Sequence, residues 1–315
     1  MAGFFNAISA VLVIFMIMAL GWVLGRLGWL TAGEKKFISK YVVNIAVPIN
    51  CVTGVLGNMS REELLNSGNQ ALAAFVVVGL GLVFSAAAGK MLRLPRSRWG
   101  PFVVMGGVSN TMMIGIPVVE QLFGPAGLPS LMVYYLFSTI YTQTVAVMLC
   151  AHAGGQESAG KIRIGSVIRD LFRKPPVLGI ITAFTLLLLD LQPPAMLMSA
   201  GKYVANTVTP LALIYSGFIL YEVGVKNLRL LPGLPAMLVI RLVLAPVMCW
   251  GVCLLLGVTG LAREVFIVMA ALPVMSQVPV LCGVYGADEK YAAIGASLSM
   301  LGMFVTLPVI MLLIG

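Results

Sequence analysis

Polar residues interrupt two apolar segments of this sequence, and their pattern favours ligand binding by backbone groups. Segment 106–117 contains three glycines and ends in a proline, and segment 273–279 begins and ends with proline. Glycine and proline disfavour a continuous helix, so each segment is predicted to break one. A break leaves free N–H groups that favour an anion and free carbonyls that favour a cation. The polar side chains beside these groups are Asn110, Thr111, Ser276 and Gln277.

Covalent chemistry is not indicated by the sequence. The five cysteines lie in or beside apolar segments, and Cys249 and Cys253 have no His, Asp or Glu nearby to complete a metal site. We expect the cysteines to be small apolar core residues. With no recognisable nucleophile–base pair, we expect no enzyme activity, no metal and no cofactor.

The composition predicts an integral membrane protein. Of the 315 residues, 60% are hydrophobic and 10% are charged, and mean hydropathy is +1.03. Soluble proteins carry roughly a quarter charged residues. The first apolar run, from Phe4, lacks a basic leader and a cleavage site, so we expect a retained helix. Apolar runs long enough to cross a membrane predict ten spans at roughly 4–25, 37–57, 70–92, 101–123, 129–151, 175–191, 196–221, 233–257, 263–286 and 291–314.

A repeated pattern indicates a duplicated unit. The motif Lys-Tyr-Val-x-Asn, followed four residues later by proline, occurs at 40–48 and again at 202–210. With the same offset of 162 residues, Pro117 corresponds to Pro279. In membrane transporters, such duplications place the binding site between the repeats.

The positive charges predict the topology of the repeats. Of the 20 Lys and Arg residues, 16 fall in odd-numbered loops and three in even-numbered loops. The positive-inside rule therefore places the odd loops in the cytoplasm and both termini outside. Five spans per repeat turn the second copy over, so Lys40 and Lys202 lie on opposite sides.

These observations predict an all-α membrane protein of ten transmembrane helices in two inverted five-helix repeats. Residues 1–151 form the first repeat, 152–174 a cytoplasmic connecting loop, and 175–315 the second repeat. Broken helices 4 and 9 are predicted to cross near the membrane midplane. The helices with Pro48 and Pro210 are expected at least to bend.

The sequence resembles the auxin efflux carrier family, which includes plant PIN-type carriers and bacterial permeases. The run Asn-Thr-x-x-x-Gly-Ile-Pro at 110–117, followed by Leu-Phe-Gly at 122–124, is similar to that family's helix 4 signature, and the resemblance covers the whole chain. The short central loop is similar to bacterial members of the malonate or malate permease type.

The resemblance implies crossed broken helices, as in bile-acid symporters and NhaA-type sodium/proton antiporters, and transport of organic anions. It places crossing residues at Asn110, Pro117 and Pro279, whereas the segment around Ser276 is a looser match. Paired aspartates like those of the antiporters are missing from the sequence. Together with the breaks, the resemblance gives the expected substrate-binding residues, which are Asn110, Thr111, Gly115, Pro117, Ser276, Gln277 and Pro279.

Two ionisable residues within predicted spans are functional candidates. The second half-helix is expected to begin at Pro117, with Glu120 in its first turn, either as a proton carrier or as a capping or solvated group. Arg241 could extend to the interface, pair with Glu222, or act as a counter-charge to a substrate carboxylate. The polar residues 138–144 of helix 5 fit either interhelical hydrogen bonds or a cavity face.

We therefore expect a secondary active transporter of small organic anions, such as malonate, malate or auxin-like acids, working by alternating access at the crossing. The alternatives are a sodium-coupled symporter of another solute and a ligand-binding membrane receptor. Coupling to H⁺ or Na⁺ stays open, as does a homodimer. The expected partners are the anion and membrane lipid, without nucleic acid, and the expected location is a bacterial inner membrane.

Overall fold

The fold is helical throughout the part of the chain that the structure describes. The structure is a computed structural model that describes residues 2–155, 169, 172–224 and 228–314. Within these ranges the one β-type contact is an isolated bridge between Ser109 and Val274. The prediction of an all-α fold is confirmed for these residues. The predicted connecting loop, 152–174, lies mostly outside the described residues.

Several of the helices are long and apolar enough to cross a membrane. Six such helical segments are found in the described residues, with two shorter apolar helices, Leu12–Arg26 and Pro175–Leu188. The two apolar runs predicted to be broken are each divided into two helices. The six long segments are Ala32–Asn58, Gly68–Met91, Pro125–Ala153, Ala195–Val223, Leu234–Leu255 and Glu289–Ile314.

The elements follow the predicted spans closely. The first half of the chain contains α1 (Ala2–Arg26), α2 (Ala32–Tyr41), η1 (Val42–Ala46), α3 (Val47–Asn58), α4 (Arg61–Leu65), α5 (Gly68–Met91), α6 (Arg96–Gly107), α7 (Gly115–Phe123), η2 (Pro125–Gly127), α8 (Leu128–Tyr141), η3 (Thr142–Ala146) and α9 (Val147–Ala153). The second half contains α11 (Pro175–Leu188), α12 (Ala195–Ala205), α13 (Val208–Val223), α14 (Leu234–Val239), η6 (Ile240–Leu244), α15 (Ala245–Leu255), α16 (Gly260–Ala271), α17 (Val278–Tyr285) and α18 (Glu289–Ile314).

Two of the long segments contain a π-helical turn just before a proline. The ring of a helical proline clashes with the carbonyl four residues earlier, and its nitrogen carries no hydrogen. Next to Pro48 and Pro246 the hydrogen-bond register widens: Val47 N–H donates to Val42 O, and Ala245 N–H donates to Ile240 O. These helices therefore continue past their prolines, whereas Asn206 and Thr207 separate α12 from α13 ahead of Pro210.

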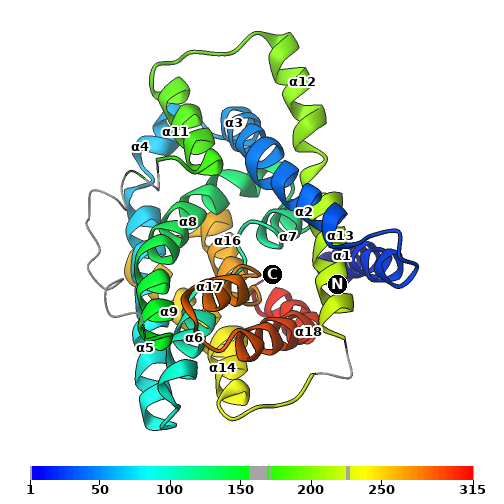
Figure 1. The fold of residues 1–315 in the computed structure, drawn as a ribbon. Coiled ribbons are helices and arrows are strands. Elements are labelled where there is room, and N and C mark those ends of the chain that lie inside the picture. The colour runs from blue at the N-terminus through cyan, green and yellow to red at the C-terminus, as the bar shows by residue number, and fades with distance from the viewer. Residues whose placement is uncertain (1, 156–168, 170–171, 225–227, 315) are drawn as a thin grey trace.

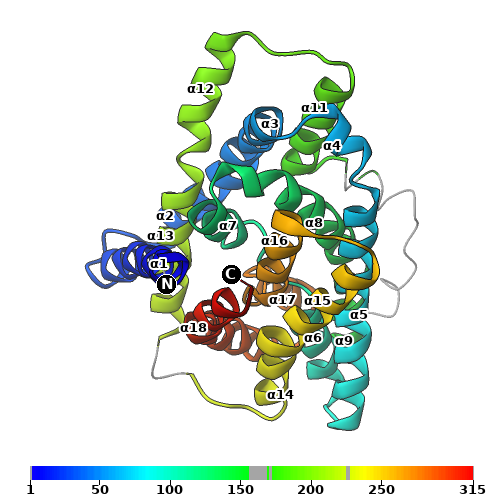
Figure 2. The same cartoon turned by 180° about the vertical axis from the view of Figure 1, so that it is seen from behind.

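The helices pack as two groups. One group consists of α1, α2, α3, α11, α12 and α13, which we call the scaffold, and the other consists of α5–α9 and α14–α18, which we call the core bundle. Figures 1 and 2 show α1 beside α13 at one edge of the molecule and α5 at the opposite edge. Within the scaffold, Lys35 of α2 forms an ion pair with Glu222 of α13, with Nζ and Oε2 2.5 Å apart.

Glycines allow α1 and α13 to approach closely. A Cβ at Gly217 would overlap the carbonyl of Met18, and one at Gly21 would overlap the carbonyl of Ile214. Small residues at such contacts are typical of membrane helices. Lipid tails are as apolar as the helices, so no hydrophobic force drives two helices together, and their association depends on close van der Waals packing. The close approach of α1 and α13 therefore depends on glycine at these positions.

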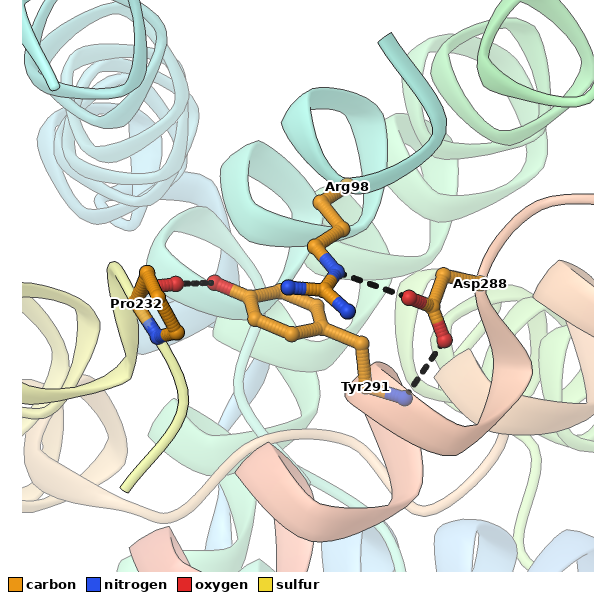
Figure 3. Close-up of polar contacts among 4 residues, drawn as sticks. All are labelled: Arg98, Pro232, Asp288 and Tyr291. Carbon is orange, nitrogen blue, oxygen red and sulfur yellow. Dashed lines mark hydrogen bonds and ion pairs between the residues drawn. The ribbon is translucent and has the colours of Figure 1, made fainter. Parts of the chain in front are cut away.

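A cluster around Tyr291 connects three parts of the core bundle (Figure 3). The Arg98 guanidinium lies 5.3 Å from the centre of the Tyr291 ring and pairs with Asp288, with Nε and Oδ2 2.8 Å apart. The Tyr291 hydroxyl donates to Pro232 O at 3.3 Å. The cluster joins the start of α6, the start of α18 and the segment before α14, so these three parts of the core bundle lie together.

Candidate functional site

The first break separates α6 from α7. α6 ends at Gly107, and Val108 is extended (φ −113°, ψ 126°). α7 begins at Gly115, two residues earlier than the expected start at Pro117, because Gly115 N–H donates to Asn110 O at 3.0 Å. The Asn110 side chain also accepts a bond from Met113 N–H at 3.3 Å, which orders the linker. Glu120 consequently lies in the second turn of α7, which corrects its expected place in the first.

The second break separates α16 from α17. α16 ends at Ala271 and Leu272 is extended (φ −63°, ψ 153°). α17 begins at Val278 with Pro279 as its second residue, where the missing N–H costs no helical bond. The linker is anchored to α18, because Val274 N–H donates to Ser299 Oγ at 2.9 Å.

The two breaks meet and bind each other. Asn110 N–H donates to Pro273 O at 2.8 Å, next to the antiparallel bridge of Ser109 and Val274. The Asn110 side-chain amide donates to Ser276 Oγ at 2.6 Å. Asn110 is 3% exposed, so these bonds satisfy polar groups that would otherwise be buried without partners. The side-chain bond between Asn110 and Ser276 thus connects two residues that are 166 positions apart in the sequence.

A cavity of about 100 Å³ lies where the breaks face the scaffold. It is lined by Asn110, Thr111, Ser276 and Gln277, four of the seven predicted substrate-binding residues. The other three do not line it: Gly115 packs closely against Met269 and Leu272, and Pro117 and Pro279 lie within the first turns of their half-helices.

The polar residues 138–144, in α8 and η3, contribute to a cavity face, whereas the hydroxyl bonds of Thr139 and Thr142 run within the helix and not between helices. Thr139 and Thr142 donate to the carbonyls of Tyr135 and Ser138 in their own helix. The same two threonines line the cavity, together with Ser138 and Gln143.

The scaffold contributes lining residues that were not among the predicted site residues: Ser39, Lys174 and Tyr215. Lys174 is the one charged residue among the described residues of the lining, which include no Asp or Glu. In the sequence, Lys174 was indistinguishable from the other basic residues that define topology. The signal that could have found it is its position directly before Pro175 and Pro176, at the start of α11.

Glu120 lies outside the cavity lining and binds the scaffold. Its carboxylate accepts a bond from Asn50 Nδ2 at 3.3 Å and another from the Thr209 hydroxyl. Asn50 follows Pro48 in α3, and Thr209 precedes Pro210 in α13. Glu120 therefore connects α7 of the core bundle to both proline-bearing helices of the scaffold.

Arg241 is buried, with 1% of its surface exposed, so it does not extend to the interface. Glu222 pairs with Lys35 and not with Arg241. The Arg241 guanidinium instead donates to Gly106 O at 3.3 Å and to Ala270 O. These carbonyls lie at the C-terminal ends of α6 and α16, and Arg241 is not part of the cavity lining.

The cysteines are buried and free of disulfides. Cys150 Sγ and Cys282 Sγ lie 3.9 Å apart, between α9 and α17. Within the described part of the chain, no group of three or more His, Cys, Asp or Glu side chains could hold a metal ion.

Comparisons with known proteins identify the family. An uncharacterized transporter of Methanocaldococcus jannaschii is 23% identical over 90% of this chain and 91% of its own length. An uncharacterized transporter of Methanothermobacter thermautotrophicus is also 23% identical, over 86% of each chain. The family model described as "Membrane transport protein" matches residues 6–311. The chain is thus a multi-pass membrane protein that belongs to this transporter family, the auxin efflux carrier family.

Proposed function

We propose that the protein is a secondary active transporter of small organic anions, with carboxylates of the size of malonate or malate as substrates. The observation that carries the proposal is the cavity at the helix breaks. Its described lining combines amide and hydroxyl groups with one lysine and contains no carboxylate. Donors of this kind replace the water that a carboxylate loses on binding, and the lysine favours a negative charge.

The size of the cavity favours a small solute over an indole acid. Pockets for drug-sized ligands usually measure roughly 300–1,000 Å³. The cavity here measures about 100 Å³, so auxin-like acids would require it to widen.

We further propose that the helical segments form ten spans in two inverted repeats, 1–151 and 175–315. Breaks in matching repeat positions support this arrangement, because Pro117 and Pro279 both lie in the first turn after a break. The Tyr291 cluster also supports it, since the three segments that it joins are all odd-numbered loops in the proposed topology. This topology has both termini outside, and the location proposed is a bacterial inner membrane.

Transport would proceed by movement of the core bundle against the scaffold. The cavity is lined from both groups, so a shift between them would change the side from which it is open. Glu120 lies on this boundary, where its carboxylate binds Asn50 and Thr209. Protonation would remove the negative charge that strengthens both bonds, and we propose that it couples movement to a proton gradient.

The test is counterflow in proteoliposomes with labelled malonate, malate, succinate and indole-3-acetate. We expect accumulation of a small carboxylate, lost in Asn110→Ala and kept in Asn69→Ala, an exposed asparagine at the start of α5. Binding without counterflow would favour the receptor alternative. Neither binding nor counterflow for any carboxylate would contradict the anion proposal.

A further inference from the structure

Arg241 is a buried charge without a carboxylate partner among the described residues. It is among the largest fully buried side chains and lies in the π-helical turn Ile240–Leu244, ahead of Pro246. The phenol of Tyr134 lies beside the guanidinium, and Arg241 Nε has no hydrogen-bond partner. An isolated charge in such a place is strongly unfavourable unless other groups compensate it.

The compensation comes from two helix ends. The last carbonyls of a helix lack intrahelical partners and carry partial negative charge. Gly106 precedes the last residue of α6, and Ala270 precedes the last residue of α16. Since Arg241 donates to both carbonyls, its guanidinium lies where the negative ends of the two broken helices converge.

This place is one where a mobile cation would otherwise be expected. Broken helices in transporters often coordinate Na⁺ through carbonyls of their C-terminal ends. Here the carbonyls of Gly106 and Ala270 are engaged by a positive group of the chain itself. A sodium ion binding to the same oxygens would lie beside a like charge in a medium of low dielectric constant, which strongly disfavours it.

We propose that Arg241 is a tethered cation that replaces a coupling cation at the crossing, so that the two half-helices are held together without Na⁺. Arginine suits this role, because its planar guanidinium reaches two acceptors at once and stays protonated at physiological pH. Arg241 is then a positioning residue that acts through α6 and α16 on the cavity residues. Only the transport measurement below rests on the proposed function.

The first test measures the unfolding temperature of the purified full chain in sodium, potassium and choline chloride at equal ionic strength. We expect no difference between the salts for the wild type. A specific stabilisation by sodium in the wild type would overturn the proposal.

The second test is chemical rescue. Arg241→Ala should lower the unfolding temperature, and guanidinium chloride, far below denaturing concentrations, should restore it, whereas equal potassium chloride should not. Arg229→Ala, at an exposed arginine, is the matched control and should respond to neither. A drop in Arg241→Ala without rescue by guanidinium would contradict the tethered cation.

A third comparison separates charge from packing and serves if Arg241→Ala cannot be purified. Arg241→Lys keeps a charge and Arg241→Met keeps a long apolar side chain. We expect the lysine variant to be the more stable one and to retain some counterflow, also without sodium. A methionine variant as stable as wild type would show that the charge is dispensable and would overturn the proposal, whatever the substrate is.

Discussion

Asn110 and Ser276 bind each other across the point where the two broken helices meet, with Nδ2 and Oγ 2.6 Å apart. Each belongs to a different half of the chain, and each also lines the cavity. The residues proposed to bind the anion therefore also hold the site together.

The Asn110–Ser276 bond should be measurable as a coupling energy. Asn110→Ala and Ser276→Ala are each expected to lower the unfolding free energy by about 1–3 kcal/mol, because a buried partner loses its bond. The double variant should lose less than the sum of the two. Unfolding in mild detergent by denaturant checks this, and strictly additive losses would mean that the bond is not formed in the folded protein.

Lys174 should attract the anion to the cavity. Lys174→Gln is expected to raise the KM of the transported anion about tenfold at low salt, in line with roughly 1.4 kcal/mol of lost attraction. Since charge attraction between exposed groups is screened by salt, the difference from wild type should shrink as ionic strength rises. Lys202→Gln, at an exposed lysine of α12 outside the cavity, is the control and should leave KM unchanged.

Glu120→Gln should uncouple transport from a pH gradient. The amide cannot change its charge, so movement of the core bundle would no longer depend on protonation. Uptake with and without an imposed gradient measures this, with Glu62→Gln in the exposed α4 as control. A variant that still responds fully to the gradient would exclude Glu120 as the proton carrier.

Gly217 should tolerate no side chain at the contact of α1 and α13. Gly217→Ala would push its Cβ into the Met18 carbonyl and separate the helices, and we expect a loss of about 1–3 kcal/mol in unfolding free energy. Gly251→Ala, in α15 with open space around it, should be neutral or slightly stabilising, because alanine favours helix. Thermal unfolding of both variants gives the comparison.

Much of the fold could be predicted because its signals are local. Apolar runs defined the helices, and the glycines and prolines of 106–117 and 273–279 defined both breaks within a few residues. The start of α7 was misplaced by two residues because it depends on hydrogen bonds of Asn110, which sequence patterns do not show.

The setting of Arg241 could not be predicted for a related reason. A search for its partner in the sequence looks for acidic side chains such as Glu222. The partners are backbone carbonyls 135 and 29 residues away, and any residue type could supply them. Lys174 was missed because only the folded scaffold shows that one of several basic residues reaches the cavity.

The burial of all five cysteines makes the chain a convenient subject for labelling. Thiols enclosed by protein react slowly with polar maleimides, so the native cysteines need not be removed. A pair of cysteines introduced at exposed Lys202 of the scaffold and exposed Lys90 of the core bundle would carry fluorophores on the two groups. Changes in energy transfer between these dyes during turnover would then report the motion of one group against the other directly.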